Sequence, residues 1–71
     1  MEVSDAVSYA LKRAGKKQSD LVDVLRVSSP QAANKKVREG RWSAEDLIAV
    51  AAFTGCKILF QMPDGEQFEL K

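Results

Sequence analysis

The sequence predicts a mainly α-helical domain that ends in a β-hairpin. Apolar residues recur at helical spacing as far as Thr54 and then alternate with polar ones on either side of a Pro-Asp-Gly turn. A chain of 71 residues and 7.8 kDa has room for only one core. We therefore expect one domain, with four or so short helices over about residues 4–55 and a two-stranded antiparallel hairpin over about residues 57–71.

The first two helices are marked by their ends. Ser4 is expected to cap the first helix, and Gly15 to end it, because glycine adopts the left-handed conformation freely. The second helix is expected over about residues 18–27. Either Lys17 or Ser19 caps it, and the pattern fits both.

The third helix has the strongest start signal of the first three. Ser29 is a good N-cap, and Pro30 is favoured at the first helical position, so we expect a helix over about residues 30–39 that stops near Gly40. Its inward face is small, with Ala33 and Val37 four residues apart. The opposite face is polar and basic, and consists of Gln31, Lys35 and Arg38, with Asn34 beside them.

The fourth helix, over residues 44–54, is largely apolar and is expected to lie centrally. Ser43 and Asp46 have the spacing of a capping box, and Trp42 and Leu47 that of a hydrophobic staple. Trp42 is therefore expected to be structural.

In the hairpin, one face of the first strand is expected to pack on the helices. It carries Ile58, Phe60 and Met62. The aromatic residues of the chain are mostly expected at core-like positions; they are Tyr9, Trp42, Phe53, Phe60 and Phe68.

Several classes of function are excluded by missing residues. Without histidine, the commonest general base and the usual zinc ligand sets are absent, and no glycine cluster could cradle a phosphate. The single cysteine, Cys56, cannot form an internal disulfide and is expected to be buried as a small apolar residue. We expect no enzyme, no cofactor and no metal. No apolar run approaches the roughly 20 residues of a membrane span, and no secretory signal is visible, so a cytoplasmic location is expected.

The net charge of +1 hides an uneven distribution along the chain. Residues 12–41 carry nine basic and three acidic side chains, a net charge of +6, whereas the segments before and after them carry −2 and −3. Lysines at helix ends explain part of this excess. The rest indicates a localised surface for phosphate groups.

The arrangement of these helices resembles the lambda-repressor-like, Cro-type helix-turn-helix family, in the small form with a C-terminal β-hairpin that bacterial mobile elements and prophages carry. The similar stretch runs from Lys17 to Val37 and is followed by Trp42-Ser43-Ala44-Glu45-Asp46-Leu47. In the turn, Arg26 stands where the family favours glycine, and inside the second helix Val22 stands where it favours alanine. The resemblance covers about residues 4–55 and implies sequence-specific binding of double-stranded DNA by a repressor-like transcriptional regulator.

The resemblance also implies which residues would contact DNA. The third helix would enter the major groove with Gln31, Asn34 and Lys35, while Gln18 and Arg38 would touch the backbone. Side-chain chemistry agrees, because Gln and Asn can pair with adenine, and Lys with guanine. Ser28 and Ser29, at a helix N-terminus, suit a phosphate oxygen. With Arg41, the expected DNA-binding residues are Gln18, Ser28, Ser29, Gln31, Asn34, Lys35, Arg38 and Arg41.

Other functions compete with this interpretation. A protein-interaction adaptor on the same fold, such as an antitoxin or antirepressor-like protein, would show an apolar or mixed third-helix face. An accessory DNA-binding factor in plasmid or element transfer is a further alternative. RNA binding is less favoured because the aromatic residues form no evident stacking platform.

The hairpin is predicted to serve association and not DNA contact. It carries Asp64, Glu66 and Glu69, which a duplex would repel. Its open edge could pair with a second copy, giving a homodimer with two third helices side by side and half-sites roughly 34 Å apart. The alternative is a monomer whose hairpin caps the helical core.

Overall fold

A computed structural model describes all 71 residues of the chain. Its elements are, in order, α1 (Val3–Arg13), the 3₁₀ turn η1 (Gln18–Asp20), α2 (Leu21–Val24), α3 (Pro30–Glu39), α4 (Ala44–Thr54), β1 (Ile58–Gln61) and β2 (Gln67–Leu70). The two strands pair in antiparallel register. The expected mainly α-helical fold with a terminal hairpin is therefore confirmed. No helix combines the length and the apolar character that a membrane crossing requires.

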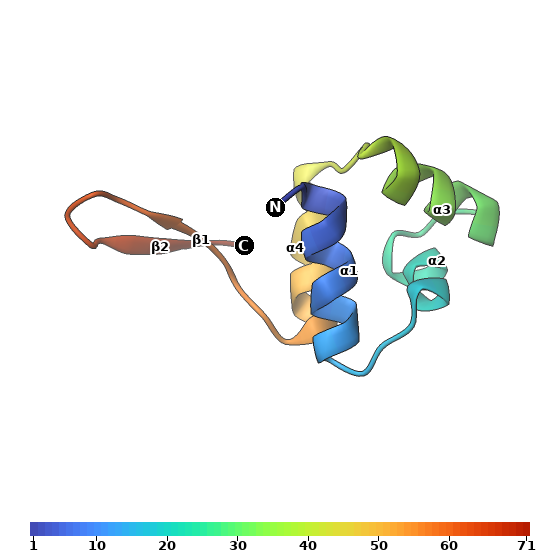
Figure 1. Ribbon diagram of the computed structural model, residues 1–71, viewed down its shortest axis with the longest axis horizontal. Coiled ribbons are helices and arrows are strands. Elements are labelled where there is room, and N and C mark those ends of the chain that lie inside the picture. Colours follow the sequence, from blue (N-terminus) through green and yellow to red (C-terminus); the bar gives the residue numbers. More distant parts are fainter.

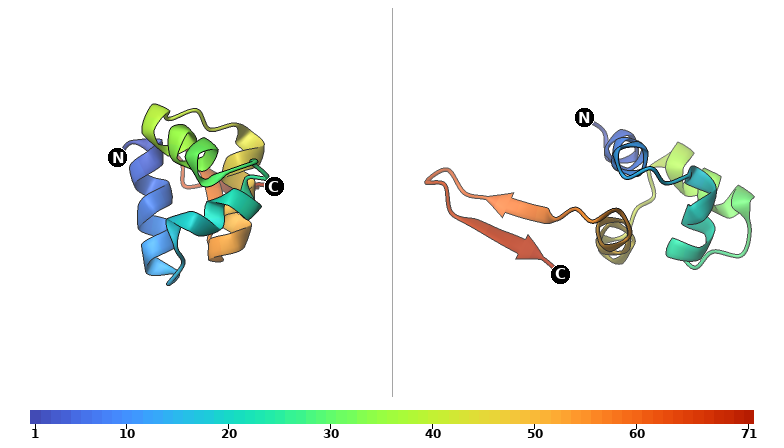
Figure 2. Two further views of the ribbon diagram at one scale, coloured as in Figure 1. Left: turned by 90° about the vertical axis from the view of Figure 1, so that its right-hand side faces the viewer. Right: turned by 90° about the horizontal axis from the view of Figure 1, so that it is seen from below.

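The elements are arranged in three parts along the longest axis of the molecule, which measures 42 Å (Figure 1). Helices α1 and α4 lie side by side in the middle. Helices α2 and α3 cover one side of this pair, and they stand in front of it in the left view of Figure 2. The hairpin projects from the other side, so α3 and the hairpin lie at opposite ends.

The core is small and lies where the helices meet. Seven residues are buried, and six of them form one cluster that draws on every helix: Val7, Leu11, Leu21, Leu25, Ala33 and Val50. Trp42 and Leu47 are half-buried against this cluster, as expected for structural residues. In α4 only Val50 and Ala51 are buried. The central helix is therefore covered less completely than its apolar sequence predicts.

Helices α3 and α4 begin as their capping residues predict. The Ser29 hydroxyl accepts a hydrogen bond from the Ala32 N–H at 3.2 Å, and Gly40 ends α3 in the left-handed conformation. At α4 the Ser43 hydroxyl accepts from the Asp46 N–H at 3.0 Å. In return the Asp46 carboxylate accepts from the Ser43 N–H, also at 3.0 Å. Both boundaries follow from side chains within three residues of each other.

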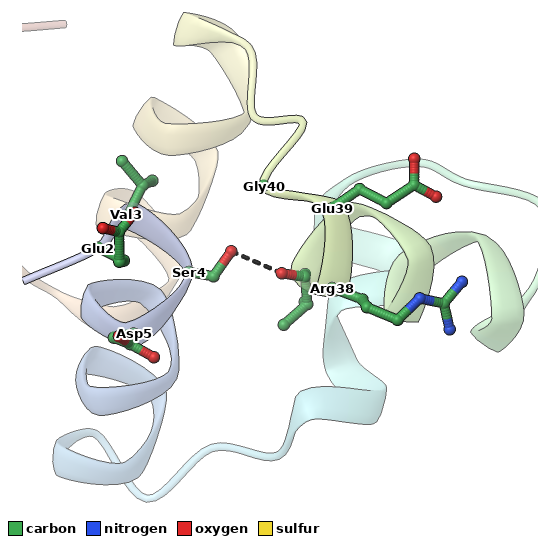
Figure 3. A pocket seen from close by; sticks show the side chains of 8 residues that line it. Glu2, Val3, Ser4, Asp5, Arg38, Glu39 and Gly40 are labelled. Atoms are coloured by element: carbon green, nitrogen blue, oxygen red, sulfur yellow. Dashed lines mark hydrogen bonds between the residues drawn. The ribbon is translucent and has the colours of Figure 1, made fainter.

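Ser4 is not the N-cap of the first helix, contrary to expectation. Helix α1 begins two residues earlier than that cap implies, with Glu2 at the cap position. The Ser4 hydroxyl instead donates to the carbonyl of Val37 at 2.6 Å, near the end of α3 (Figure 3). It also accepts from Nε1 of Trp42 at 2.9 Å. Its place inside the first turn lets it satisfy a terminal α3 carbonyl that has no partner within the helix.

The second helix is shorter than the expected span of residues 18–27. It opens as a 3₁₀ turn after Lys17, whose N–H donates to the Asp20 carboxylate at 3.0 Å, and its α-helical part ends at Val24. The chain then closes in a Schellman arrangement, because the N–H groups of Arg26 and Val27 reach back to Asp23 and Val22. Arg26 has φ 54° and is the only residue other than glycine in the left-handed region.

The sequence predicts that the apolar face of the hairpin packs on the helices, but in the structure most of this face is exposed. Ile58 pairs with Leu70, and Phe60 with Phe68, so these four side chains share one face. Only the pair at the base is partly buried, whereas Phe60 is 55% and Phe68 50% exposed. The two rings stack on each other at 5.3 Å between centroids. The prediction of core-like positions is therefore wrong for both rings, and also for Tyr9, which is exposed on α1.

Cys56 is exposed and not buried, because the hairpin leaves the helical body directly after it. Its Sγ lies 3.1 Å from the Thr54 hydroxyl. The alternative, in which the hairpin caps the helical core, does not match the structure, since beyond its half-buried base the hairpin projects away from the helices in Figure 1 and in the right view of Figure 2.

Replacing Ser4 should destabilise the fold. In Ser4→Ala the indole N–H of Trp42 and the carbonyl of Val37 both lose their partner, and we expect a loss of about 1–3 kcal/mol in the free energy of unfolding. Urea denaturation followed by Trp42 fluorescence measures it. Ser8→Ala is the matched control, because Ser8 is exposed on the same helix. Equal stability of the two variants would contradict the role assigned to Ser4.

Replacing Arg26 by glycine should stabilise the fold by up to about 1 kcal/mol. A residue with a Cβ atom pays a conformational cost in the left-handed region that glycine avoids. Arg26→Ala keeps the Cβ atom and should show no such gain. Thermal melts of both variants separate this backbone effect from loss of the arginine charge, which the two variants share.

Candidate nucleic-acid interface

Helix α3 presents a continuous polar face to solvent. Ala33 is 1% exposed and anchors the helix in the core, and Val37 is half-buried one turn later. The expected residues of the opposite face are all exposed: Gln31, Asn34, Lys35 and Arg38. This face lies at the end of the molecule away from the hairpin (Figure 1). It can therefore approach a large partner without obstruction from the rest of the chain.

Two residues of the predicted site are joined across the turn between the second and third helices. The side-chain Nε2 of Gln18 donates to Oδ1 of Asn34 at 3.0 Å. Gln18 opens η1, sixteen residues before Asn34. The bond orients the Asn34 amide while leaving both of its own N–H donors and one Oδ1 lone pair free. Asn34 is thus held in place and still able to form two hydrogen bonds with a ligand.

The N-terminal end of α3 offers donors for an anion. Ser28 is exposed, and Ser29 is half-buried with its oxygen occupied as the cap of the helix, although its hydroxyl hydrogen can still be donated. Pro30 has no N–H, and the backbone N–H of Gln31 has no partner within the chain. A free amide at the positive end of a helix favours a phosphate oxygen.

The C-terminal end of α3 carries mixed charge. Arg41 is exposed, and its Nε lies 3.0 Å from a carboxylate oxygen of Glu39, which engages part of its guanidinium group. A shallow cavity of about 400 Å³ separates this end from the start of α1, where Glu2 and Asp5 lie (Figure 3). In that view the side chain of Arg38 points away from α1. The acidic groups limit how far an anion surface extends past Arg38.

Lys36 belongs to the fold and not to the exposed face. Its Nζ lies 2.8 Å from Oδ2 of Asp46 at the start of α4, and the Asp46 side chain is only 12% exposed. Partial burial raises the pKa of Asp46, but the bond from Lys36, the N–H of Ser43, the positive charge of Lys36 and the Ser43 hydroxyl together hold this pKa below its ordinary value. Of the two adjacent lysines, Lys35 is thus free and Lys36 is paired.

The fold turns the charge pattern of the sequence into a separation in space. Residues 12–41, with a net charge of +6, run from the end of α1 through α2 and α3, and these last two helices form one side of the molecule (Figure 1). The acidic hairpin lies on the opposite side. At the boundary, Nζ of Lys16 lies 5.0 Å above the ring of Phe53. An anionic partner would therefore be attracted to the α2–α3 side.

Sequence reasoning found the members of the polar face but missed two side-chain contacts in and behind α3. The Gln18–Asn34 bond and the Lys36–Asp46 ion pair both join segments whose approach depends on the tertiary fold. No local pattern distinguishes Lys35 from Lys36 except the helical period, which places Lys36 closer to the inward face.

Comparison of the chain with models of protein families, with curated proteins and with solved structures finds no match.

The stability of the fold should depend on pH through Asp46. Folding lowers the pKa of this carboxylate, so its charged form stabilises the native state when the pH is above the pKa that the group has in the unfolded chain. This contribution is lost as the pH falls below about 4. In Asp46→Asn we expect a loss of about 1–2 kcal/mol at pH 7 and a shallower decline in acid. Denaturant titrations at several pH values measure both.

Glu45→Gln is the control for this prediction, because Glu45 is an exposed neighbour in the same helical turn and makes no ion pair. If both variants lost the same stability at pH 7, the loss would come from the general charge of the helix start. The specific bonds of Asp46 would then contribute nothing measurable.

Proposed function

We propose that this chain is a sequence-specific double-stranded DNA-binding protein that reads the major groove with α3. It acts by occupancy, as a repressor-like regulator of a bacterial mobile element or prophage in the cytoplasm, and its fold is a variant of the lambda-repressor-like, Cro-type helix-turn-helix. The observation that carries the proposal is the exposed polar face of α3, anchored from behind by buried Ala33 and braced by the Gln18–Asn34 bond.

The shape of the interface supports this proposal. The major groove of B-form DNA is about 12 Å wide and admits one α-helix. Helix α3 has ten residues, and the opposite end of the molecule holds the hairpin, so the helix can enter a groove without a clash from that element (Figure 1). The neighbouring η1 and α2 then lie across the edge of the groove, where a first helix of this motif contacts the backbone.

The chemistry of the face fits base edges. With Oδ1 oriented by Gln18, Asn34 can donate from Nδ2 to N7 of adenine and accept from N6 with its remaining lone pair. Gln31 lies one turn earlier and can make the same kind of pair, while Lys35 suits the O6 and N7 acceptors of guanine. Gln18 would position a base-reading residue as well as approach a phosphate.

Phosphate contacts come from the two ends of α3. The free N–H of Gln31 with the hydroxyls of Ser28 and Ser29 form one donor group, and Arg38 with the unpaired part of Arg41 forms the other. Such contacts fix the register of the helix on the duplex and leave the reading of sequence to the middle of α3.

A protein-interaction adaptor is the second candidate, because the hairpin exposes apolar side chains that suit a protein partner. This surface lies on the side away from α3, so the two functions are compatible in one molecule. An adaptor that lacks DNA binding would have no use for the cationic α3 face. Binding-site selection from a random pool of duplexes distinguishes the two, because only the DNA-binding protein enriches a motif.

Variants of α3 should lose affinity for the selected duplex in a sequence-dependent way. Asn34→Ala and Gln31→Ala should each cost about 1–3 kcal/mol and relax the preference for one base. Gln18→Ala should weaken the same base preference as Asn34→Ala, since the two side chains are bonded. Fluorescence anisotropy with the selected site and its single-base variants measures these effects.

The salt dependence of binding provides the control. With about six phosphate contacts, the slope of log affinity against log salt should be on the order of −5, and Arg38→Ala should reduce it by about one. Lys71→Ala removes a similar charge at the hairpin end and should leave the slope unchanged. A wild-type slope near zero would refute electrostatic binding of DNA.

A further inference from the structure

The large exposed apolar side chains of this protein are confined to the N-terminal segment and the hairpin. The large apolar residues that stay exposed are Met1, Val3, Tyr9, Leu59, Phe60, Met62 and Phe68. All of them belong to α1, the residues before it, or the hairpin, and none belongs to α2 or α3. Exposed apolar surface of this extent in a small domain marks a contact with another protein.

An apolar groove lies beside the base of the hairpin. It has a volume of about 340 Å³ and runs between α1 and α4, and all of its lining residues except Lys57 are apolar. Those that form its walls include Val3, Ala6 and Ala10 of α1, Leu47 and Ala51 of α4, and Ile58 of β1. A cavity of about 150 Å³ accepts one benzene ring. The groove therefore has room for two aromatic side chains.

We propose that a second copy of this chain fills the groove, with Phe60 and Phe68 of each copy seated in the α1–α4 groove of the other. The groove and the projecting hairpin adjoin, since Ile58 belongs to both. When one hairpin enters the partner's groove, the partner's hairpin therefore lies next to the first groove. One two-fold axis satisfies both contacts and closes the dimer.

The surface area of the chain supports a partner of this size. A compact monomer of 7.8 kDa exposes about 4,400 Å², so the observed 5,299 Å² is an excess of about 900 Å². A standard interface removes about 800 Å² from each partner. Burying the projecting hairpin against a second copy would give each chain a more ordinary exposure.

The distribution of charge favours one orientation of the partner's hairpin along α1. The tip of the hairpin carries Asp64 and Glu66, and α1 is acidic at its start and basic in its last turn, with Lys12 and Arg13. Arg13 lines the cavity that continues the groove toward the end of α1. The tip of a partner hairpin is thus attracted to the C-terminal end of α1 and repelled by its N-terminal end.

The mass in solution, measured by sedimentation equilibrium without DNA, tests this proposal independently of the proposed function. We expect a dimer whose dissociation constant rises by at least about tenfold in the double variant Phe60→Ser, Phe68→Ser, as for buried aromatic anchors. Leu59→Ser, on the opposite hairpin face, is the control and should keep the wild-type mass. A mass of one chain from low micromolar to several hundred micromolar would overturn the proposal.

A second variant tests the groove and does not depend on the folding of the hairpin. Ala6→Glu places a charge in the groove at an exposed position of α1, and it should weaken the dimer to a similar extent. Ser8→Glu adds the same charge on another face of the same helix and should not. If the phenylalanine variant lost the dimer while Ala6→Glu kept it, the hairpins would pair with each other, and docking in the groove would be wrong.

Cys56 reports on occupancy of the groove, because it is exposed and lines it. Its reaction with a thiol reagent should slow several-fold as the protein concentration rises through the dimer range. In the phenylalanine variant the rate should not change with concentration. A wild-type rate that is also independent of concentration, in a protein shown to be a dimer, would place the interface elsewhere.

Discussion

The hydroxyl group of Ser4 joins three segments on which the arrangement of the helices depends. It donates to the carbonyl of Val37 in α3 and accepts from the indole of Trp42 in the loop before α4, while its own backbone belongs to α1. Only seven residues are buried, so the apolar core alone holds the helices weakly. The half-buried hydrogen bonds of Ser4, where the start of α1 meets the end of α3, supply the orientation that a larger core would provide. The angle at which α3 presents its polar face depends on these hydrogen bonds and on Ala33.

The different roles of Lys35 and Lys36 in α3 follow from the small size of the core. A short helix with few apolar residues has to be fastened by other means, and here Lys36 serves that purpose through Asp46 at the start of α4. Asp46 also accepts from the Ser43 N–H, so one carboxylate caps α4 and anchors α3. Lys35, one residue earlier, is left exposed for a ligand. Two identical side chains thus differ in their surroundings, because they leave the helix on different sides: Lys36 stabilises the fold, and Lys35 stays in contact with solvent.

The two ends of the molecule differ in chemistry as well as in position. The α2–α3 side is polar and basic, whereas the hairpin side exposes aromatic rings and carboxylates. Because the elements of these sides lie at opposite ends of a 42 Å axis, a ligand at one end would leave the other end accessible. Under the proposed functions, the distance between two DNA half-sites would then be set by how two hairpins and grooves engage, and not by α3. This differs from the simple edge pairing that the hairpin sequence suggests.

The sequence by itself determined the local features of this protein. The helix ends at Ser29, Gly40 and Ser43, the hairpin turn and the outward face of α3 all depend on residues within about four positions of each other, so the pattern predicts them. Tertiary structure alone decided the bonds of Ser4 to Val37 and Trp42, which are 33 and 38 residues away, and the bond of Gln18 to Asn34. It also decided that the hairpin projects and leaves Cys56 and Phe60 exposed, which an alternating strand pattern cannot reveal. Alternation shows that one face of a strand is apolar, but what covers that face depends on the path of the whole chain.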